Sequence, residues 1–461
     1  MNPHLKKLTL QEWNRQYEHL HQQGMQEPNY GGPLCRHVLE GDTRLERLLF
    51  DPSPAALRLW NLLLTEEQRL HDARQQGMQI VGTMKDLGTI PVLAQAFPRV
   101  SPFYPDGAWW TPCIMEMNDT LLHVADRLGI DETFCPVRAM LAAFVTQKHF
   151  PIPDLLICSA GAVCDDFSAI VQRLDAMGHP VLWWEIPHRR KPAPGETPVQ
   201  LPGGNLAPHT QVALVESELT RIAAALEVLA DTPLDMNQLS QTIRRVNQVR
   251  KRLQTLREKV FMSPHTPLPA LEMHIAEMLA IHFCSDIAET EAVLDGLLTE
   301  VEQRINAQQG FSTTDAIRVF WVNPVADLRL MNILENLGGR LCGTDFMFTH
   351  ALDPISETIP PLEALAQSAL ADPMVGSAND RAQRILRDAR RFEAEALVVC
   401  RVPGASHCAT EGPQLAAPVR QELGIPFVEI EVPPLEDALD GSITTKLEAL
   451  LETARLNRRD A

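Results

Sequence analysis

Short apolar runs alternate with amphipathic segments in two separate stretches of the chain. The runs have the length and composition of buried strands, and most of them end in Gly, Pro or other small residues. They are residues 78–83, 154–161, 180–187, 316–324, 340–345, 396–404 and 424–433. Between them, apolar positions recur at helical spacing, for example in MEMNDTLLHVADRLG and DDFSAIVQRLDAMG. Because strands that alternate with helices form parallel sheets, the pattern predicts two α/β lobes of Rossmann or flavodoxin-like type.

The remaining segments have a different character. The N-terminal part is rich in Leu, Glu, Gln and Arg at helical spacing, a Pro- and Gly-rich connector covers 191–208, and 209–310 is helical nearly throughout. This second helical stretch alternates charge with an apolar stripe, which favours a helical insertion or interdomain arm with a solvated face. The predicted organisation is an N-terminal helical segment (1–75), a first α/β lobe (76–190), a linker with a helical insertion (191–315) and a second α/β lobe (316–461).

Composition narrows the classes of function. The chain has 461 residues and a formal net charge of −18. That sign argues against nucleic acid and against an anionic membrane surface as partners. No apolar run approaches the roughly 18 residues of a membrane span, and the N-terminus lacks the apolar core of a signal peptide. Nine cysteines without a secretion signal indicate a reducing compartment, so a cytoplasmic protein is expected.

The cysteines show none of the local spacings that mark a zinc ribbon, a thioredoxin-type site or a ferredoxin. A cluster held by loops from separate strands needs no such motif. Cys135 follows a helix-ending glycine, while Cys164 and Cys408 follow the small-residue turns SAGA and PGAS. Small residues let backbone amides approach a sulfide cluster, so these three loops are the predicted ligand loops. The other cysteines have weaker contexts: Cys158, Cys342 and Cys400 lie inside strands, Cys35 and Cys284 lack supporting neighbours, and Cys113 is intermediate.

Other chemistries have little support. No phosphate-binding loop, dinucleotide fingerprint or G-x-S-x-G elbow occurs. His407 beside Cys408 suggests an activated thiol only weakly, because sequence neighbours usually point apart. Glu116 and Asn118 stand where a helix opens and either contact a polar substrate group or cap the helix.

The stretch 112–187 resembles the subunits of 2-hydroxyacyl-CoA dehydratases and ATP-dependent benzoyl-CoA reductases. The resemblance rests on MEMND, RLGIDETFCPVR and PIPDLLICSAGAVCDD, and in the second half on IRVFWVN, LENLGG, the late cysteine after a strand, GIPFVEIE and TTKLEALLE. It covers roughly residues 78–190 and 316–455.

The resemblance implies a [4Fe-4S] cluster on Cys135, Cys164 and Cys408, with its fourth iron open to substrate or another ligand. It implies an acyl-CoA substrate, a separate ATP-dependent iron–sulfur activator, and a homologous second subunit or a homodimer. One electron passed to the thioester carbonyl would give a ketyl radical anion, and Glu116 would then act in proton transfer. The basic run His188-Arg189-Arg190-Lys191 would contact the CoA phosphates or form a solvated loop.

Two departures from the family pattern keep alternatives open. Many members have a cysteine after the strand that follows LENLGG, whereas this chain has Met347 near that place. The helical stretch and the long N-terminus also make the chain larger than many relatives. The alternatives are a double-cubane [8Fe-9S] reductase of small molecules, which would recruit Cys113, Cys342 or Cys400, and a non-catalytic scaffold subunit without a cluster.

Overall fold

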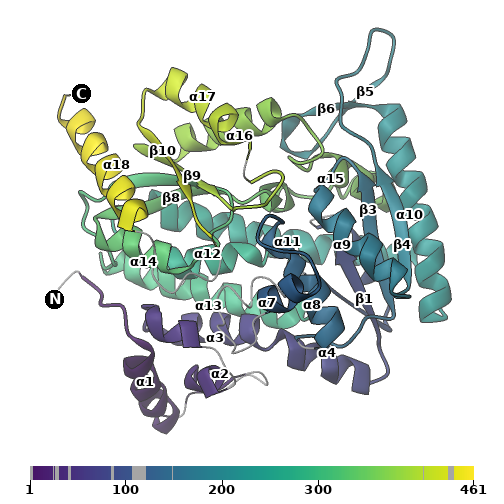
Figure 1. Cartoon of the computed structure of the whole chain (residues 1–461), viewed down its shortest axis with the longest axis horizontal. Coiled ribbons are helices and arrows are strands. Elements are labelled where there is room, and N and C mark those ends of the chain that lie inside the picture. Colours follow the sequence, from purple (N-terminus) through teal and green to yellow (C-terminus); the bar gives the residue numbers. More distant parts are fainter. Residues whose placement is uncertain are drawn as a thin grey trace.

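The fold is that of a computed structural model, which describes residues 4–23, 25, 31–39, 43–84, 88–105, 121–147, 149–408, 410–433 and 441–460. Two four-stranded parallel sheets lie in different parts of the molecule, with helices around and between them (Figure 1). The predicted α/β class with two parallel-sheet lobes is therefore confirmed. Among the helices of these residues, none is long and apolar enough to cross a membrane.

Both sheets have the same strand order. The first sheet consists of β1 (Gln79–Met84), β2 (Val100–Phe103), β3 (Leu155–Gly161) and β4 (Val181–Ile186), in the spatial order β2-β1-β3-β4. The second consists of β7 (Ile317–Val322), β8 (Gly339–Asp345), β9 (Ala396–Arg401) and β10 (Phe427–Glu431), in the order β8-β7-β9-β10. In each sheet the first strand lies between the second and the third, so the direction of strand addition reverses beside the first strand. Ligands of open parallel sheets bind beyond the carboxyl ends of the strands at such a reversal.

Helices connect the strands within each lobe. In the first lobe they are α5 (Ile90–Ala94), α7 (Leu121–Arg127), η2 (Pro136–Arg138), α8 (Ala139–Thr146) and α9 (Asp165–Ala176). In the second they are α14 (Arg329–Asn336), η4 (Phe348–Leu352), α15 (Pro361–Leu370), α16 (Ala378–Arg391) and α17 (Gly412–Leu423), followed by α18 (Gly441–Asp460). Local sequence sets several of these boundaries. Gly129, after α7, has φ +80°, a conformation that ends helices, and the hydroxyl of Ser377 accepts a hydrogen bond from the N–H of Asp380 at the start of α16.

The N-terminal segment and the stretch 209–310 are helical, as predicted. The described N-terminal helices are α1 (Leu10–Gln22), α2 (Cys35–Leu39), η1 (Thr43–Arg47), α3 (Pro54–Leu64) and α4 (Glu66–Gln75). The later helices are α10 (His209–Ala230), α11 (Met236–Met262), α12 (Ala270–Met278) and α13 (Ile287–Asn306). Helix α10 packs along β4, and α11 packs against α13, α5 and β8. Figure 1 shows α11 and α12 in the centre of the molecule, between the sheets.

One hydrophobic core joins these parts. Its buried side chains come from α1 and α3, both sheets and all the helices from α10 to α13. Helix α11 also buries two charged residues, Arg250 and Arg257. Arg257 is ion-paired with Glu277 of α12 and donates to the hydroxyl of Thr344 in β8 at 2.6 Å. The apolar stripe of the sequence therefore identifies the buried face of α11, and Arg257 on that helix reaches a polar group of the second sheet.

Two regions differ from the sequence-based expectation. Strand β2 was not predicted, because its four residues include a proline and carry no apolar run of their own. The Pro- and Gly-rich connector contains η3 (Pro202–Gly204) within an antiparallel ribbon of β5 (Pro198–Gln200) and β6 (Leu206–Pro208). Gly203 within it has φ +77°, which a residue with a side chain rarely adopts.

Candidate functional site

The three predicted ligand cysteines lie in loops at the carboxyl-end edges of the two sheets. Cys164 follows the end of β3 and directly precedes α9, and Cys408 follows the end of β9. These are corresponding places in the two lobes, because β3 and β9 are each the third strand of their sheet. Cys135 directly precedes η2, on the path from β2 to β3. Each lobe thus contributes one cysteine from the loop after its third strand, Cys164 in the first lobe and Cys408 in the second. The first lobe also contributes Cys135.

All three cysteines line one cavity of about 110 Å³. The remaining wall is mainly apolar and comes from both lobes and from the end of α12. The other lining residues are Val137, Asp166, Phe167, Met278, Ile281, Pro324, Phe346, Met347, Phe348, Met374, Ala405 and His407. A cavity with three thiols and few other polar groups has the donor chemistry of an iron–sulfur site.

A glycine allows the loops of the two lobes to meet. Gly404, in the second lobe, has φ +76°, and its Cα lies against the backbone between Phe134 and Cys135 of the first lobe. A Cβ built there would stand 2.5 Å from the carbonyl carbon of Phe134 and 3.0 Å from the backbone nitrogen of Cys135. The close approach that Gly404 allows is between the loops of Cys408 and Cys135, and the predicted approach of backbone amides to a cluster stays a prediction.

The thiols are held in their neutral form by burial. Desolvation raises the pKa of Cys164 to about 11 and that of Cys408 to about 12, and it raises the pKa of Cys135 well above its usual value. The charge of Asp166 also raises the pKa of all three thiols, and the charge of Cys164 raises the pKa of Cys135 and Cys408, because one anion disfavours another nearby. Binding of a soft metal group would therefore release protons and would remove the cost of the buried charges.

Backbone amides partly oppose this effect. Hydrogen bonds from the N–H groups of Phe167 and Asp166 lower the pKa of Cys164, which stands at the N-terminus of α9. The N–H of Val137 does the same for Cys135 at the start of η2. Helix N-termini present unpaired N–H groups to anions, so both sulfurs occupy positions that favour a thiolate. The amides come from the first helical turns and not from the small-residue turns that precede the cysteines.

Asp166 joins the loops of Cys164 and Cys408. Its Oδ2 accepts hydrogen bonds from the backbone N–H and the hydroxyl of Ser406 at 3.0 and 2.9 Å, and it lies 3.5 Å from the Cys164 sulfur. The Ser406 hydroxyl lies 3.9 Å from the same sulfur. One carboxylate oxygen therefore fixes the relative position of two ligand loops.

Arg381 of α16 supplies positive charge near Cys408. Its guanidinium is buried, donates to Asp345 and Asn323 at 2.7 and 2.6 Å, and is ion-paired with Glu411 at 3.2 Å. Burial is the main cause of the raised pKa of Cys408, and Arg381 is the first group that lowers it. The guanidinium thus favours the thiolate form of this cysteine.

Comparison with protein families identifies the chain. The model of the family "2-hydroxyglutaryl-CoA dehydratase, D-component" matches residues 94–454, well over half of the sequence. The chain belongs to this family. Its members are subunits of 2-hydroxyacyl-CoA dehydratase type and typically carry a [4Fe-4S] cluster. None of the curated proteins with which the chain was compared matches it.

Three thiols line the cavity, and thiolates are the usual protein ligands of iron–sulfur clusters. Within the described part of the chain, no group of three or more His, Cys, Asp or Glu residues is placed so that it could hold a metal ion. A [4Fe-4S] cluster binds each thiolate at a different iron, so its ligands are spread around it. The donor set of three thiols therefore fits the cluster that the family typically carries.

The remaining residues that the sequence analysis singled out lie in different parts of the chain. Cys158, Cys342 and Cys400 are buried within β3, β8 and β9, as expected for core residues. Glu116, Asn118 and Cys113 lie outside the described residues. His407 lines the cavity together with Cys408, and its Nδ1 lies 3.6 Å from Glu411.

Sequence reasoning did not identify three polar side chains that lie beside the predicted ligand cysteines. Asp166 is recognisable only as an acidic residue in the first turn of a helix, Ser406 as a member of a small-residue turn, and Arg381 as one of several arginines on α16. Their contacts join residues 240 and 36 positions apart, so no local pattern signals them. The wall contributed by Met278 and Ile281 was missed for the same reason, because the helical segment had no predicted place beside the cysteines.

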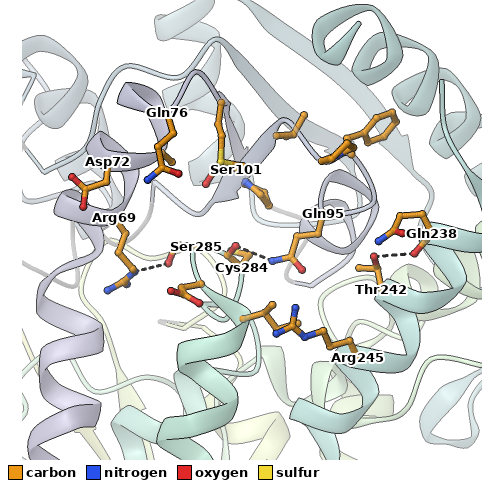
Figure 2. A pocket seen from close by; sticks show the side chains of 18 of the residues that line it. Arg69, Asp72, Gln76, Gln95, Ser101, Gln238, Thr242, Arg245, Cys284 and Ser285 are labelled. Carbon is orange, nitrogen blue, oxygen red and sulfur yellow. Dashed lines mark hydrogen bonds between the residues drawn. The ribbon is translucent and has the colours of Figure 1, made fainter. Parts of the chain in front are cut away.

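A larger cavity lies elsewhere in the described part of the chain. It has a volume of about 500 Å³ and opens where β1 and β2 begin, between α4, α5, α11 and the start of α13. Figure 2 shows polar side chains around it, with Arg69 donating to Ser285 at 3.2 Å and Gln95 donating to the carbonyl of Cys284 at 2.8 Å. None of the predicted ligand cysteines lines it. Cavity size alone would therefore not have led to the predicted ligand cysteines.

Proposed function

We propose that this chain is the iron–sulfur subunit of an enzyme that dehydrates or reduces an acyl-CoA thioester, with a [4Fe-4S] cluster bound by Cys135, Cys164 and Cys408. The observation that carries the proposal is that these three thiols, from loops of both lobes, line one largely apolar cavity. Family membership supports the same reaction class.

The residues of the chain have defined tasks in this proposal. A bound cluster supplies one-electron chemistry at low potential. The helix N-termini at Cys135 and Cys164 and the guanidinium of Arg381 stabilise the negative charge of the thiolates. The apolar wall, with Phe167 and Phe346 among its residues, keeps water away from the reacting groups.

A groove lined by arginines supports an anionic substrate. It has a volume of about 80 Å³, and Arg189, Arg381, Arg384 and Arg387 line it together with a single carboxylate residue, Asp380. The groove lies close to the cysteine cavity, because Pro373 lines the groove while the next residue, Met374, lines the cavity.

We assign this groove to the phosphate groups of the CoA moiety. Arg189 belongs to the basic run noted in the sequence, and its buried side chain is fixed by Asp380 at 3.2 Å and by the carbonyl of Leu370 at 2.6 Å. Arg387 is 55% exposed and donates to the carbonyl of Gly203 at 3.2 Å. Guanidinium groups bind phosphate oxygens through paired, charge-assisted hydrogen bonds.

The proposal includes two partners. The electron would come from a separate ATP-dependent iron–sulfur activator, and a homologous second subunit or a second copy of the chain would complete the enzyme. Glu116 is the proposed proton-transfer residue. These assignments rest on the family resemblance.

The deciding experiment is the iron and acid-labile sulfide content of the full chain, purified and reconstituted without oxygen. We expect about four irons per chain, because three thiols and an open position suit one [4Fe-4S] cluster. Single substitutions Cys135→Ala, Cys164→Ala and Cys408→Ala should each lower the iron content. Cys284→Ala is the matched control, because this buried thiol lines the other large cavity and should leave the iron content unchanged.

Different results would lead to different conclusions. About eight irons per chain would replace the proposal with a double-cubane reductase and would bring further cysteines into the site. No iron after reconstitution would leave a scaffold subunit. Retention of all iron by the three single variants and by their combination would refute the ligand assignment.

A further inference from the structure

Met347 brings a fourth sulfur to the cysteine cavity. It follows the end of β8 by two residues, is 7% exposed and lines the cavity. Its Sδ lies 3.2 Å from the Sγ of Cys408. The cavity therefore contains three thiols and a thioether, and the thioether is in direct contact with one of the thiols.

The backbone of Met347 is strained in a way that fixes this position. Its φ and ψ are 62° and −41°, a region that residues with side chains rarely adopt. Hydrogen bonds hold both sides of the residue. The N–H of Phe346 donates to the Thr349 hydroxyl at 3.1 Å, and the N–H of Phe348 donates to the carbonyl of Phe346 at 2.6 Å. Strain of this kind costs about 1–3 kcal/mol and persists only where the surrounding structure imposes it.

Packing alone does not account for these features. Phe346 and Phe348 already supply apolar surface on either side, and a leucine would fill a similar volume without sulfur. What the methionine adds is a soft, uncharged donor atom. Thioether sulfur binds the same class of soft metal centres as thiolate, but more weakly and without adding charge.

We infer that Met347 is a fourth, displaceable sulfur ligand of the metal group held by Cys135, Cys164 and Cys408. This inference rests on the proposed function, because it requires a cluster in the cavity. A neutral ligand adds no fourth anionic sulfur to a cavity that three cysteines and the Asp166 carboxylate already line. It also gives way to an entering oxygen donor more readily than a thiolate does.

The test compares Met347→Leu with wild type, using full chains reconstituted without oxygen. Met374→Leu is the matched control, since Met374 is a similarly buried methionine of the same cavity wall. The readouts are iron content, the electron paramagnetic resonance spectrum of the reduced protein, and titration of that spectrum with cyanide. We expect Met347→Leu to keep its iron but to change the spectrum. If Met347 occupies the fourth position about nine-tenths of the time, cyanide should bind the variant about tenfold more tightly.

Met347→Cys is the second variant, in case leucine is not tolerated. A thiolate at this place should lower the reduction potential and prevent cyanide binding. The inference is refuted if iron-loaded Met347→Leu has the spectrum and cyanide affinity of wild type, or if Met347→Cys still binds cyanide as wild type does. If the wild-type chain still contains iron in that case, the proposed cluster site stands and only the role of Met347 is refuted. A wild-type chain without iron would instead refute the proposed function and, with it, this inference.

Discussion

Asp166 and Ser406 are separated by 240 positions in the chain, yet one carboxylate oxygen of Asp166 accepts two hydrogen bonds from Ser406, one from its backbone N–H and one from its hydroxyl. Asp166 lies two positions after Cys164 in the chain, and Ser406 lies two positions before Cys408. The contact therefore connects the ligand loops that follow the third strands of the two sheets.

Asp166→Ala should weaken iron binding without removing a ligand. Loss of the shared acceptor frees the Ser406 loop, and supporting residues of metal sites typically change metal affinity by about 10- to 100-fold. The measurement is the rate at which a chelator removes iron from the reconstituted protein. Asp165→Ala is the control, because Asp165 is the exposed neighbour in the same helical turn. Equal rates for the two variants would show that the Asp166 contact does not position the ligands.

Gly404→Ala should damage the site more than its backbone conformation alone explains. Both Gly404 and Gly178 have positive φ values, +76° and +91°, so alanine costs about 1–2 kcal/mol at either place. At Gly178 no atom lies within 4 Å of the added Cβ, whereas at Gly404 the Cβ would overlap the backbone of Phe134. We expect both variants to have lower thermal midpoints at the same scan rate, and only Gly404→Ala to lose iron. If both variants lost iron, the iron loss of Gly404→Ala would result from general destabilisation and not from the contact with Phe134.

Glu272 should make stability depend on pH. Burial, followed by the charge of Asp51, raises the pKa of Glu272 from 4.5 to about 8. A carboxyl with a raised pKa binds more protons in the folded state, so its contribution to the free energy of unfolding falls as pH rises from about 4.5 to about 8. Above that window the loss is complete.

Urea unfolding of wild type and Glu272→Gln tests this expectation. The glutamine cannot ionise and keeps an oxygen for the N–H groups of Asp51 and Trp60, which bond Glu272 at 2.9 and 3.2 Å. Relative to wild type, the variant should gain stability progressively between about pH 5 and about pH 8. Glu302→Gln on the surface of α13 is the control. A constant difference between variant and wild type across this range would contradict the raised pKa.

Arg387→Ala should weaken the binding of CoA. The control is Arg390→Ala, on the same helix, because Arg390 is similarly exposed, pairs with Glu422 and does not line the arginine groove. Loss of one charge-assisted contact should weaken CoA binding about tenfold, or about 1.4 kcal/mol. Binding of pantetheine, which lacks the phosphates, should not change. Calorimetric titration measures both ligands, and an equal effect of the two arginine variants on CoA would reject the groove as the phosphate site.

Periodicity within short windows was enough to predict most of the elements. Each predicted strand run overlaps a strand of the structure, from β1 to β10, because a buried strand of a parallel sheet is a local apolar run. The same logic failed for β2, whose place in the sheet is set by pairing with β1 and not by its own residues. Strand ends, a helix-ending glycine and small-residue turns are visible in the sequence. They were enough to predict that Cys135, Cys164 and Cys408 lie in loops and are candidate ligands.

The sequence by itself therefore determined the α/β class, the two lobes and the loops that carry the cysteines, since these depend on neighbours in the chain. Only the tertiary structure decided which side chains share a cavity. The Asp166–Ser406 contact, the 3.2 Å approach of Met347 to Cys408 and the charge of Arg381 beside that cysteine all join residues from different elements. Such contacts arise from the packing of the two sheets around α11 and α12, and packing depends on shape and burial across the whole chain.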